Sequence, residues 1–79
     1  MNWQDHVGSS PDVLGGKPVV RGTRLSVEFL LGLCAAGWSE AQIFENYPAV
    51  SEPALRAVFA YAADALAEDT LYQVRRQAG

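Results

Sequence analysis

The sequence predicts a mainly α-helical domain in which a short N-terminal β-hairpin precedes a three-helix, helix-turn-helix-like (homeodomain-like) bundle. Three observations lead to this fold class. Residues 15–25 are rich in glycine and proline and offer two tight turns within a few residues. Three serines, Ser26, Ser39 and Ser51, each precede a segment with apolar residues at helical spacing. Only residues 48–50 connect the last two segments, which is typical of a helix-turn-helix unit.

The predicted hairpin lies in the stretch of least ordinary composition. Its arms are expected to be Pro18–Val20 and Thr23–Leu25, with Arg21 and Gly22 at the bend. Glycine is suited to the bend because it tolerates the positive φ that a two-residue turn requires. Arms this short are not stable alone, so we expect the hairpin to pack on the helices that follow.

Upstream of the hairpin the pattern is weaker. Trp3 and Val7 fit either an irregular segment or the ends of a short strand that pairs with the hairpin or with a second subunit. The segment Gly8–Pro11 has the composition of a turn. The only histidine, His6, is expected on the surface rather than in a catalytic site.

The first helix is expected to begin after Ser26 and to end before Gly37. A serine hydroxyl is a good N-cap, and glycine commonly takes the left-handed conformation that ends a helix. The predicted buried stripe of this helix consists of Phe29, Leu30, Leu33 and Cys34. Within such a stripe Cys34 is more typical of a small core residue than of a nucleophile.

The second helix is predicted to begin with a capping box formed by Ser39 and Gln42 and to end near Pro48. Ser51 is expected to cap the third helix, which continues without interruption to about residue 66. One apolar stripe follows its length: Leu55, Val58, Phe59, Ala62 and Leu66. Alanines make the rest of its surface smooth, and we expect that surface to meet another helix.

Length and composition indicate one domain, residues 1–79, with an N-terminal arm and hairpin (1–25), a helical body (26–69) and a helix extension or tail (70–79). A chain of this size buries only about 60–65% of its unfolded surface, so a homodimer is expected. The single cysteine excludes an internal disulfide, and the absence of metal-ligand spacing predicts no metal or other cofactor. No apolar run approaches the ~20 residues that span a bilayer, so we expect a cytoplasmic protein without membrane contact.

The net charge of −3 is unevenly distributed along the chain. Residues 1–25 carry three cations against two carboxylates, whereas residues 26–69 carry one cation against seven carboxylates. A polyanion would therefore have to approach the hairpin end or the C-terminal tail. The acidic body is better suited to a basic protein partner.

The run Pro11–Leu25, followed by a helix and then by Ala35–Glu40 and Ile43–Pro48, closely resembles a small bacterial family. That family is catalogued as domain of unknown function 433 and is often described as a predicted VapB-type antitoxin. The resemblance covers about residues 9–63, and its most specific part is Gly-Lys-Pro-Val-Val-Arg-Gly-Thr-Arg. It implies the antitoxin of a type II toxin–antitoxin pair, which binds and neutralises a PIN-like ribonuclease toxin and also binds its own promoter DNA as a dimer.

The candidate contacts with operator DNA are four cations. Lys17, Arg21 and Arg24 are the expected phosphate contacts, since they project from one small element. Arg56 is the expected base reader, because residues 51–60 hold no other side chain suited to that role. In the alternative reading, Arg21 and Arg24 are structural and pair with helix carboxylates such as Glu28 or Glu45.

The alternative function is a protein-interaction or dimerisation module that has this fold and binds no nucleic acid. The alanine-rich last helix and the net acidity favour it. The residues expected at a partner or dimer interface are Trp3, Leu66, Leu71 and Tyr72. Catalysis and a small-molecule substrate are not expected, because the sequence offers no nucleophile–base pair and its Gly-Gly-Lys segment lacks the context of a P-loop.

Overall fold

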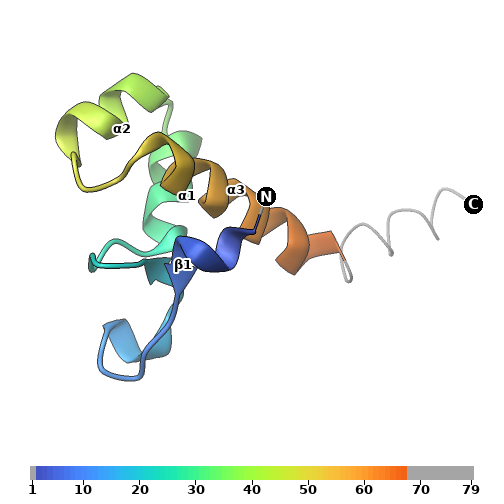
Figure 1. The fold of residues 1–79 in the computed structure, drawn as a ribbon. Coiled ribbons are helices and arrows are strands. Elements are labelled where there is room, and N and C mark those ends of the chain that lie inside the picture. The colour runs from blue at the N-terminus through green and yellow to red at the C-terminus, as the bar shows by residue number, and fades with distance from the viewer. Residues whose placement is uncertain (1, 68–79) are drawn as a thin grey trace, which may run out of the picture.

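The computed structural model describes residues 2–67, which are mainly helical (Figure 1). Two 3-10 helices and two short strands come first: η1 (Trp3–Asp5), β1 (Val7–Gly8), η2 (Leu14–Gly16) and β2 (Val19–Val20). Three α-helices follow: α1 (Val27–Ala35), α2 (Glu40–Asn46) and α3 (Glu52–Leu66). The predicted fold class, three helices after a short N-terminal antiparallel sheet, is confirmed. The predicted extension or tail, residues 70–79, lies outside the described residues.

The antiparallel sheet pairs β2 with β1 rather than with the residues after the bend. Val7 lies opposite Val20 and Gly8 opposite Val19, so the strand at Val7 pairs with the hairpin segment, as one alternative expected. A strand with Trp3 and Val7 at its ends is wrong, because Trp3 belongs to the 3-10 helix η1. The expected second arm, Thr23–Leu25, is not a strand. Besides the bonds that close the turn, it is joined to β2 by the bond from the Val20 N–H to the Leu25 carbonyl, 3.0 Å, and the next residue, Ser26, forms a single bridge with Val19.

Thr23 explains why the second arm is short. Its N–H and its hydroxyl both donate to the carbonyl of Val20, at 3.0 and 2.8 Å, and its Oγ1 accepts the N–H of Leu25 at 3.0 Å. These local bonds close the turn and replace the ladder that a longer arm would form. Gly22 has φ +79°, which confirms its predicted role at the bend and makes this a type II turn.

Each helix begins where the sequence predicts. The hydroxyls of Ser26, Ser39 and Ser51 accept the backbone N–H three residues on, at 2.9, 3.1 and 3.2 Å. The Gln42 side chain completes the predicted capping box by accepting the Ser39 N–H at 2.8 Å. These bonds satisfy N–H groups that a helix start otherwise leaves without partners, and they fix where each helix enters the fold.

The end of α1 also follows the prediction. Gly37 has φ +98°, its N–H donates to the Cys34 carbonyl at 3.0 Å, and the next N–H, of Trp38, donates to the Leu33 carbonyl at 3.0 Å. This pair of bonds is the Schellman motif, which requires a residue at ease with positive φ. The chain then reverses into α2 within three residues.

The core lies where α3 meets α1 and the N-terminal segment, η1 and β1. The largest fully buried side chains are aliphatic and come from five parts of the chain: Val7, Leu30, Ile43, Val50, Leu55 and Val58. Ala54 and Ala57 are also buried, so the inner face of α3 is partly built of small residues and its neighbours approach closely.

The expectation that Phe29 is buried was wrong. Phe29, predicted in the buried stripe of α1, is 42% exposed, and Val27 takes its place in the core. Phe59 is only partly buried, at the edge of the core. Phe29 instead meets Tyr47 edge to face, with the ring centroids 5.7 Å apart. The aromatic rings therefore surround an aliphatic core and do not fill it.

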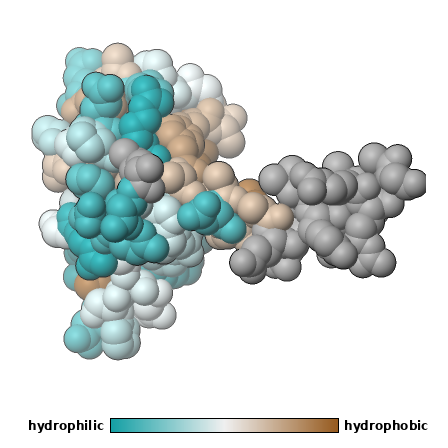
Figure 2. Space-filling view, turned by 45° about the vertical axis from the view of Figure 1, so that its right-hand side comes forward, coloured by the Kyte–Doolittle hydropathy of each residue, from teal (hydrophilic) through white to brown (hydrophobic). Residues whose placement is uncertain are grey.

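No helix within residues 2–67 has the length and apolar character needed to cross a membrane. The last turns of α3 form a projection from the body (Figures 1 and 2). The face of this projection that Figure 2 shows is largely apolar, with one hydrophilic patch beside it.

A matched pair of leucine truncations tests the position of the core. Leu30→Ala should lower the free energy of unfolding by about 2–5 kcal/mol, because it leaves a cavity at a fully buried site. Leu66→Ala makes the same chemical change at a side chain that is 57% exposed and should cost under about 0.5 kcal/mol. Equilibrium unfolding in urea measures both values. Similar costs for the two variants would contradict this description of the core.

Candidate functional site

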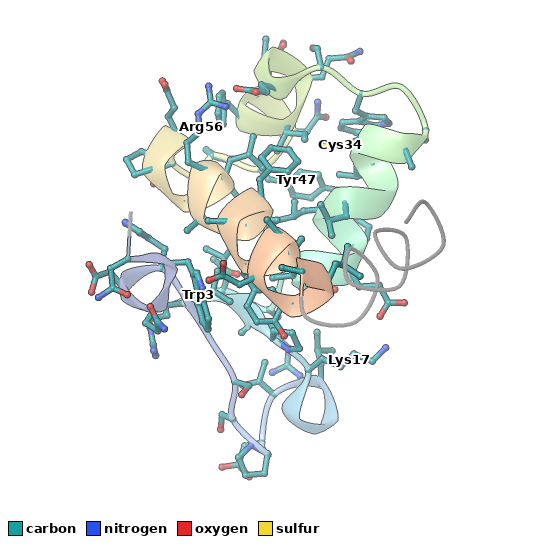
Figure 3. The ribbon with its side chains drawn as sticks, turned by 90° about the vertical axis from the view of Figure 1, so that its right-hand side faces the viewer. Trp3, Lys17, Cys34, Tyr47 and Arg56 are labelled. Atoms are coloured by element: carbon teal, nitrogen blue, oxygen red, sulfur yellow. The ribbon has the colours of Figure 1, made fainter. Side chains whose placement is uncertain are left out.

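The four cations predicted to contact DNA do not form one positive surface. Lys17 and Arg56 lie near opposite ends of α3 (Figure 3). Lys17 Nζ is 3.3 Å from Oε2 of Glu28, and Arg56 Nη1 is 3.4 Å from Oε2 of Glu40. Both pairs are largely solvent-exposed and contribute little to stability, but each places a carboxylate beside the cation that an approaching polyanion would meet.

Arg21 has a structural role in the N-terminal sheet. Its Nε donates to the Gln4 carbonyl at 2.9 Å, and its backbone N–H donates to the His6 carbonyl at 2.8 Å. The guanidinium lies over Gly8, where an added Cβ would come within 2.5 Å of Nη1. The expected pairing of Arg21 and Arg24 with helix carboxylates is wrong within the described residues, because Arg21 bonds a backbone carbonyl while Glu28 pairs with Lys17.

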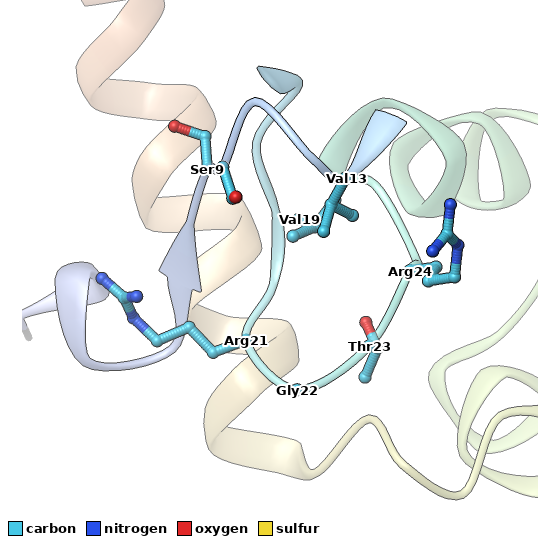
Figure 4. Close-up of a pocket in the computed structure, with 8 residues that line it drawn as sticks. Ser9, Val13, Val19, Arg21, Gly22, Thr23 and Arg24 are labelled. Carbon is cyan, nitrogen blue, oxygen red and sulfur yellow. The ribbon is translucent and has the colours of Figure 1, made fainter. Parts of the chain in front are cut away.

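An open hollow of about 510 Å³ lies beside the turn that carries Arg21 and Arg24. It is lined by Ser9, Ser10, Val13, Val19 and residues 21–24. The two arginine side chains leave the turn in opposite directions (Figure 4). Within residues 2–67, these are the two cations that form no ion pair. The hollow therefore has hydroxyl groups and unneutralised positive charge at its rim, the chemistry that binds a phosphate.

Trp3, predicted at an interface, has partners within its own chain. The indole meets Tyr61 edge to face at a centroid distance of 4.9 Å, and its Nε1 donates to Oδ2 of Asp64 at 2.7 Å. Figure 3 shows Trp3 against α3. These contacts hold η1 against the C-terminal half of α3. The role of Trp3 in an interface stays a prediction.

Leu66, also predicted at an interface, lies at one end of an apolar groove of about 320 Å³ between α1 and α3. The groove is lined by Lys17 and Pro18, by Val27, Glu28 and Leu31 of α1, and by Tyr61, Ala62, Ala65 and Leu66 of α3. A large exposed leucine beside a concave apolar surface is typical of a protein-binding site. The other two predicted interface residues, Leu71 and Tyr72, lie outside the described residues.

Within the described part of the chain, no three His, Cys, Asp or Glu side chains are grouped so that they could hold a metal ion. Cys34 lies near the C-terminal end of α1, where it is half-buried and packs against the core.

A family model described as "Protein of unknown function (DUF433)" matches residues 7–62. The chain belongs to this family. The matched range runs from β1 to the middle of α3 and agrees with the resemblance seen over about residues 9–63. It contains the whole hollow and most of the groove, and only Ala65 and Leu66 of the groove lie beyond it.

Two relatives extend this result. The uncharacterized protein y4eO of Sinorhizobium fredii (strain NBRC 101917 / NGR234) is 45% identical over 56 residues, which are 71% of this chain and 25% of that protein. The chain thus spans a quarter of the length of this curated relative. A crystal structure of a DUF433 member from Anabaena variabilis ATCC 29413 matches with a TM-score of 0.71 and 27% identity, over 94% of this chain and 68% of that chain.

Leu31 and Tyr61, which form the facing walls of the groove, were not predicted as site residues. Leu31 is four residues after Val27, and Tyr61 is four before Ala65, so helical spacing placed each on one face with another groove residue. Helical spacing alone does not identify Leu31 and Tyr61 as site residues, because the sequence does not tell which apolar face of α1 or α3 remains uncovered. The partnership of Gly8 with Arg21 had no sequence signal.

A double-mutant cycle tests the contact between Arg21 and Gly8. Gly8→Ala should cost about 1 kcal/mol in the free energy of unfolding, because the new methyl displaces the guanidinium and breaks its bond to Gln4. In an Arg21→Ala background the same change should be neutral or stabilising, since alanine is preferred to glycine in a strand. Urea unfolding of the four proteins gives the coupling. Equal costs in both backgrounds would show that the two residues are independent.

Proposed function

We propose that this DUF433 protein is the antitoxin of a type II toxin–antitoxin pair and acts by binding a basic protein, a PIN-like ribonuclease. The observation that carries the proposal is the charge of the helical body. Residues 26–67 hold five carboxylates and one cation, and that cation, Arg56, is paired with Glu40. Such a surface attracts a protein whose own surface is shaped to bind RNA.

Two further features support this proposal. The glycine-lysine-proline segment resembles that of predicted VapB-type antitoxins, which is the basis for naming the toxin class. The groove between α1 and α3 offers apolar surface for a protein partner on the same acidic body. An antitoxin of this kind needs no catalytic group, because it acts by covering the toxin.

Coexpression tests the proposed function. The chain should copurify with the product of the neighbouring open reading frame and inhibit the ribonuclease activity of that product at stoichiometric amounts. Glu45→Lys, a charge reversal on the exposed surface of the body, should weaken the complex several-fold, whereas Asp12→Lys on the N-terminal arm should not. Ribonuclease assays and calorimetry measure both effects. Absence of copurification and of inhibition by the wild-type chain would refute the antitoxin proposal.

A second candidate function, binding of operator DNA as a homodimer, is favoured by one specific feature. Arg21 and Arg24, the two described cations without an ion pair, share the rim of one hollow with the hydroxyls of Ser9 and Ser10. In this proposal the hollow receives a backbone phosphate, and Arg56 leaves Glu40 to read a base. The alternative is a protein-interaction module that binds no nucleic acid.

The salt dependence of DNA binding distinguishes these possibilities. Arg24→Ala should lower the slope of log affinity against log salt by about 0.9, because one phosphate contact is lost. Arg56→Ala removes the same charge and should leave the slope unchanged while relaxing the preference at one base position. Fluorescence anisotropy with promoter duplexes measures both. The absence of salt-dependent binding by the wild-type chain would refute the operator-binding proposal.

A further inference from the structure

The groove between α1 and α3 is a preformed concave surface. Its α3 wall contains Tyr61, whose ring is held edge to face against Trp3, and Trp3 is held in turn by its 2.7 Å bond to Asp64. A wall fixed in this way loses little conformational entropy when a ligand arrives. The floor is apolar, since Val27 and Leu31 face Ala62 across it.

The dimensions of the groove suit a small number of apolar side chains. Its volume is about 320 Å³, at the lower end of the range for ligand pockets. Ala62 and Ala65 leave space where longer side chains of α3 would have closed the gap to α1. A partner helix that places two neighbouring apolar side chains, at i and i+3 or i+4, in such a space uses the common helix-in-groove mode.

The charge of the surface around the groove favours a partner of opposite charge. Glu28 is one of the lining residues, and its side chain is 79% exposed. Asp64 of α3 is not a lining residue and accepts the Trp3 bond. Lys17 and Glu28 are the only charged side chains among the lining residues, and they neutralise each other. The charge preference therefore comes from the helical body, where residues 26–67 hold five carboxylates and one cation. That cation, Arg56, is at the far end of α3 (Figure 3). An occupant with its own positive charge beside the apolar side chains is therefore favoured over an acidic one.

We propose that the α1–α3 groove binds a basic amphipathic helix of the partner protein, with apolar side chains between Leu31 and Ala62 and a lysine or arginine beside Glu28. This inference rests on the proposed function as a protein-binding antitoxin and identifies which surface performs it. The Leu66 side chain, 57% exposed at the groove end, becomes covered in the complex.

A synthetic peptide tests the chemistry of the groove. The probe is a helical peptide of about 18 residues with leucine on one face and lysine on the other, and its control carries glutamate in place of lysine. Titrated into the full chain and followed by NMR, the lysine peptide should shift the signals of Leu31, Ala62 and Ala65 and bind at least tenfold more tightly than the glutamate peptide. Equal affinity of the two peptides, or shifts confined to other residues, would overturn the proposal.

Two alanines of α3 provide matched variants. Ala65 lines the groove and Ala63 does not, and both are exposed, so Ala65→Arg and Ala63→Arg add the same charge without disturbing the core. We expect Ala65→Arg to weaken binding of the lysine peptide at least tenfold and Ala63→Arg to change it less than twofold. Equal effects of the two variants would overturn the proposal, because they would reflect charge alone.

Other occupants of the groove predict different results. If a second copy fills it, Ala65→Arg should convert a dimer to a monomer in light scattering. If the chain's own C-terminal segment fills it, Leu71→Asp should strengthen binding of the lysine peptide. Either result overturns the assignment of the groove to a partner helix.

The same variant separates this inference from the proposed function. If Ala65→Arg inhibits the ribonuclease as well as the wild type does, the groove assignment fails and the antitoxin proposal stands. If the wild-type chain does not bind the neighbouring gene product but binds the lysine peptide as described, the antitoxin proposal fails and the chemistry of the groove stands.

Discussion

The inner face of α3 is the constraint on which the rest of the structure depends. Ala54, Leu55, Ala57 and Val58 are buried together, and α1, η1 and β1 all pack on this one helix. With two alanines on that face, the neighbouring elements approach α3 closely, and the aliphatic side chains of the other elements complete the core. Neither strand is stable by itself, so the two-stranded sheet exists because Val7 and Val20 are buried in the same core.

The dependence on α3 also explains how the charges are arranged. The helix is longer than the body that covers it, and its two ends meet different neighbours (Figure 3). Near its beginning Arg56 pairs with Glu40 of α2, and beside its later turns Lys17 pairs with Glu28 of α1. Two of the described cations are thus neutralised at separate places. Within the described chain, Arg21 and Arg24 at the turn are the two cations that have no carboxylate partner.

Features that depend on local sequence were predictable, and features that depend on distant contacts were not. Serine caps, the capping box and the glycine that ends α1 each act within a few residues, so composition and spacing identify them. The pairing of β2 with residues 7 and 8 joins segments more than ten residues apart, and both candidate arms had suitable composition. In α1, Phe29 and Val27 both fit helical spacing. Only the position of α3 decides that Val27 faces the core and leaves the groove open beside it.

Both candidate surfaces meet at β2 and the residue before it. Pro18, which precedes β2, lines the groove, and Val19 of β2 lines the hollow. The hollow continues into the turn of Arg21 and Arg24, and the groove continues between α1 and α3. The two linings have no residue in common, so a ligand in the groove does not occupy the residues that line the hollow. Lys17 and Pro18 line the groove, whereas Val19 and residues 21–24 line the hollow, so the unusual composition of residues 15–25 contributes to both surfaces.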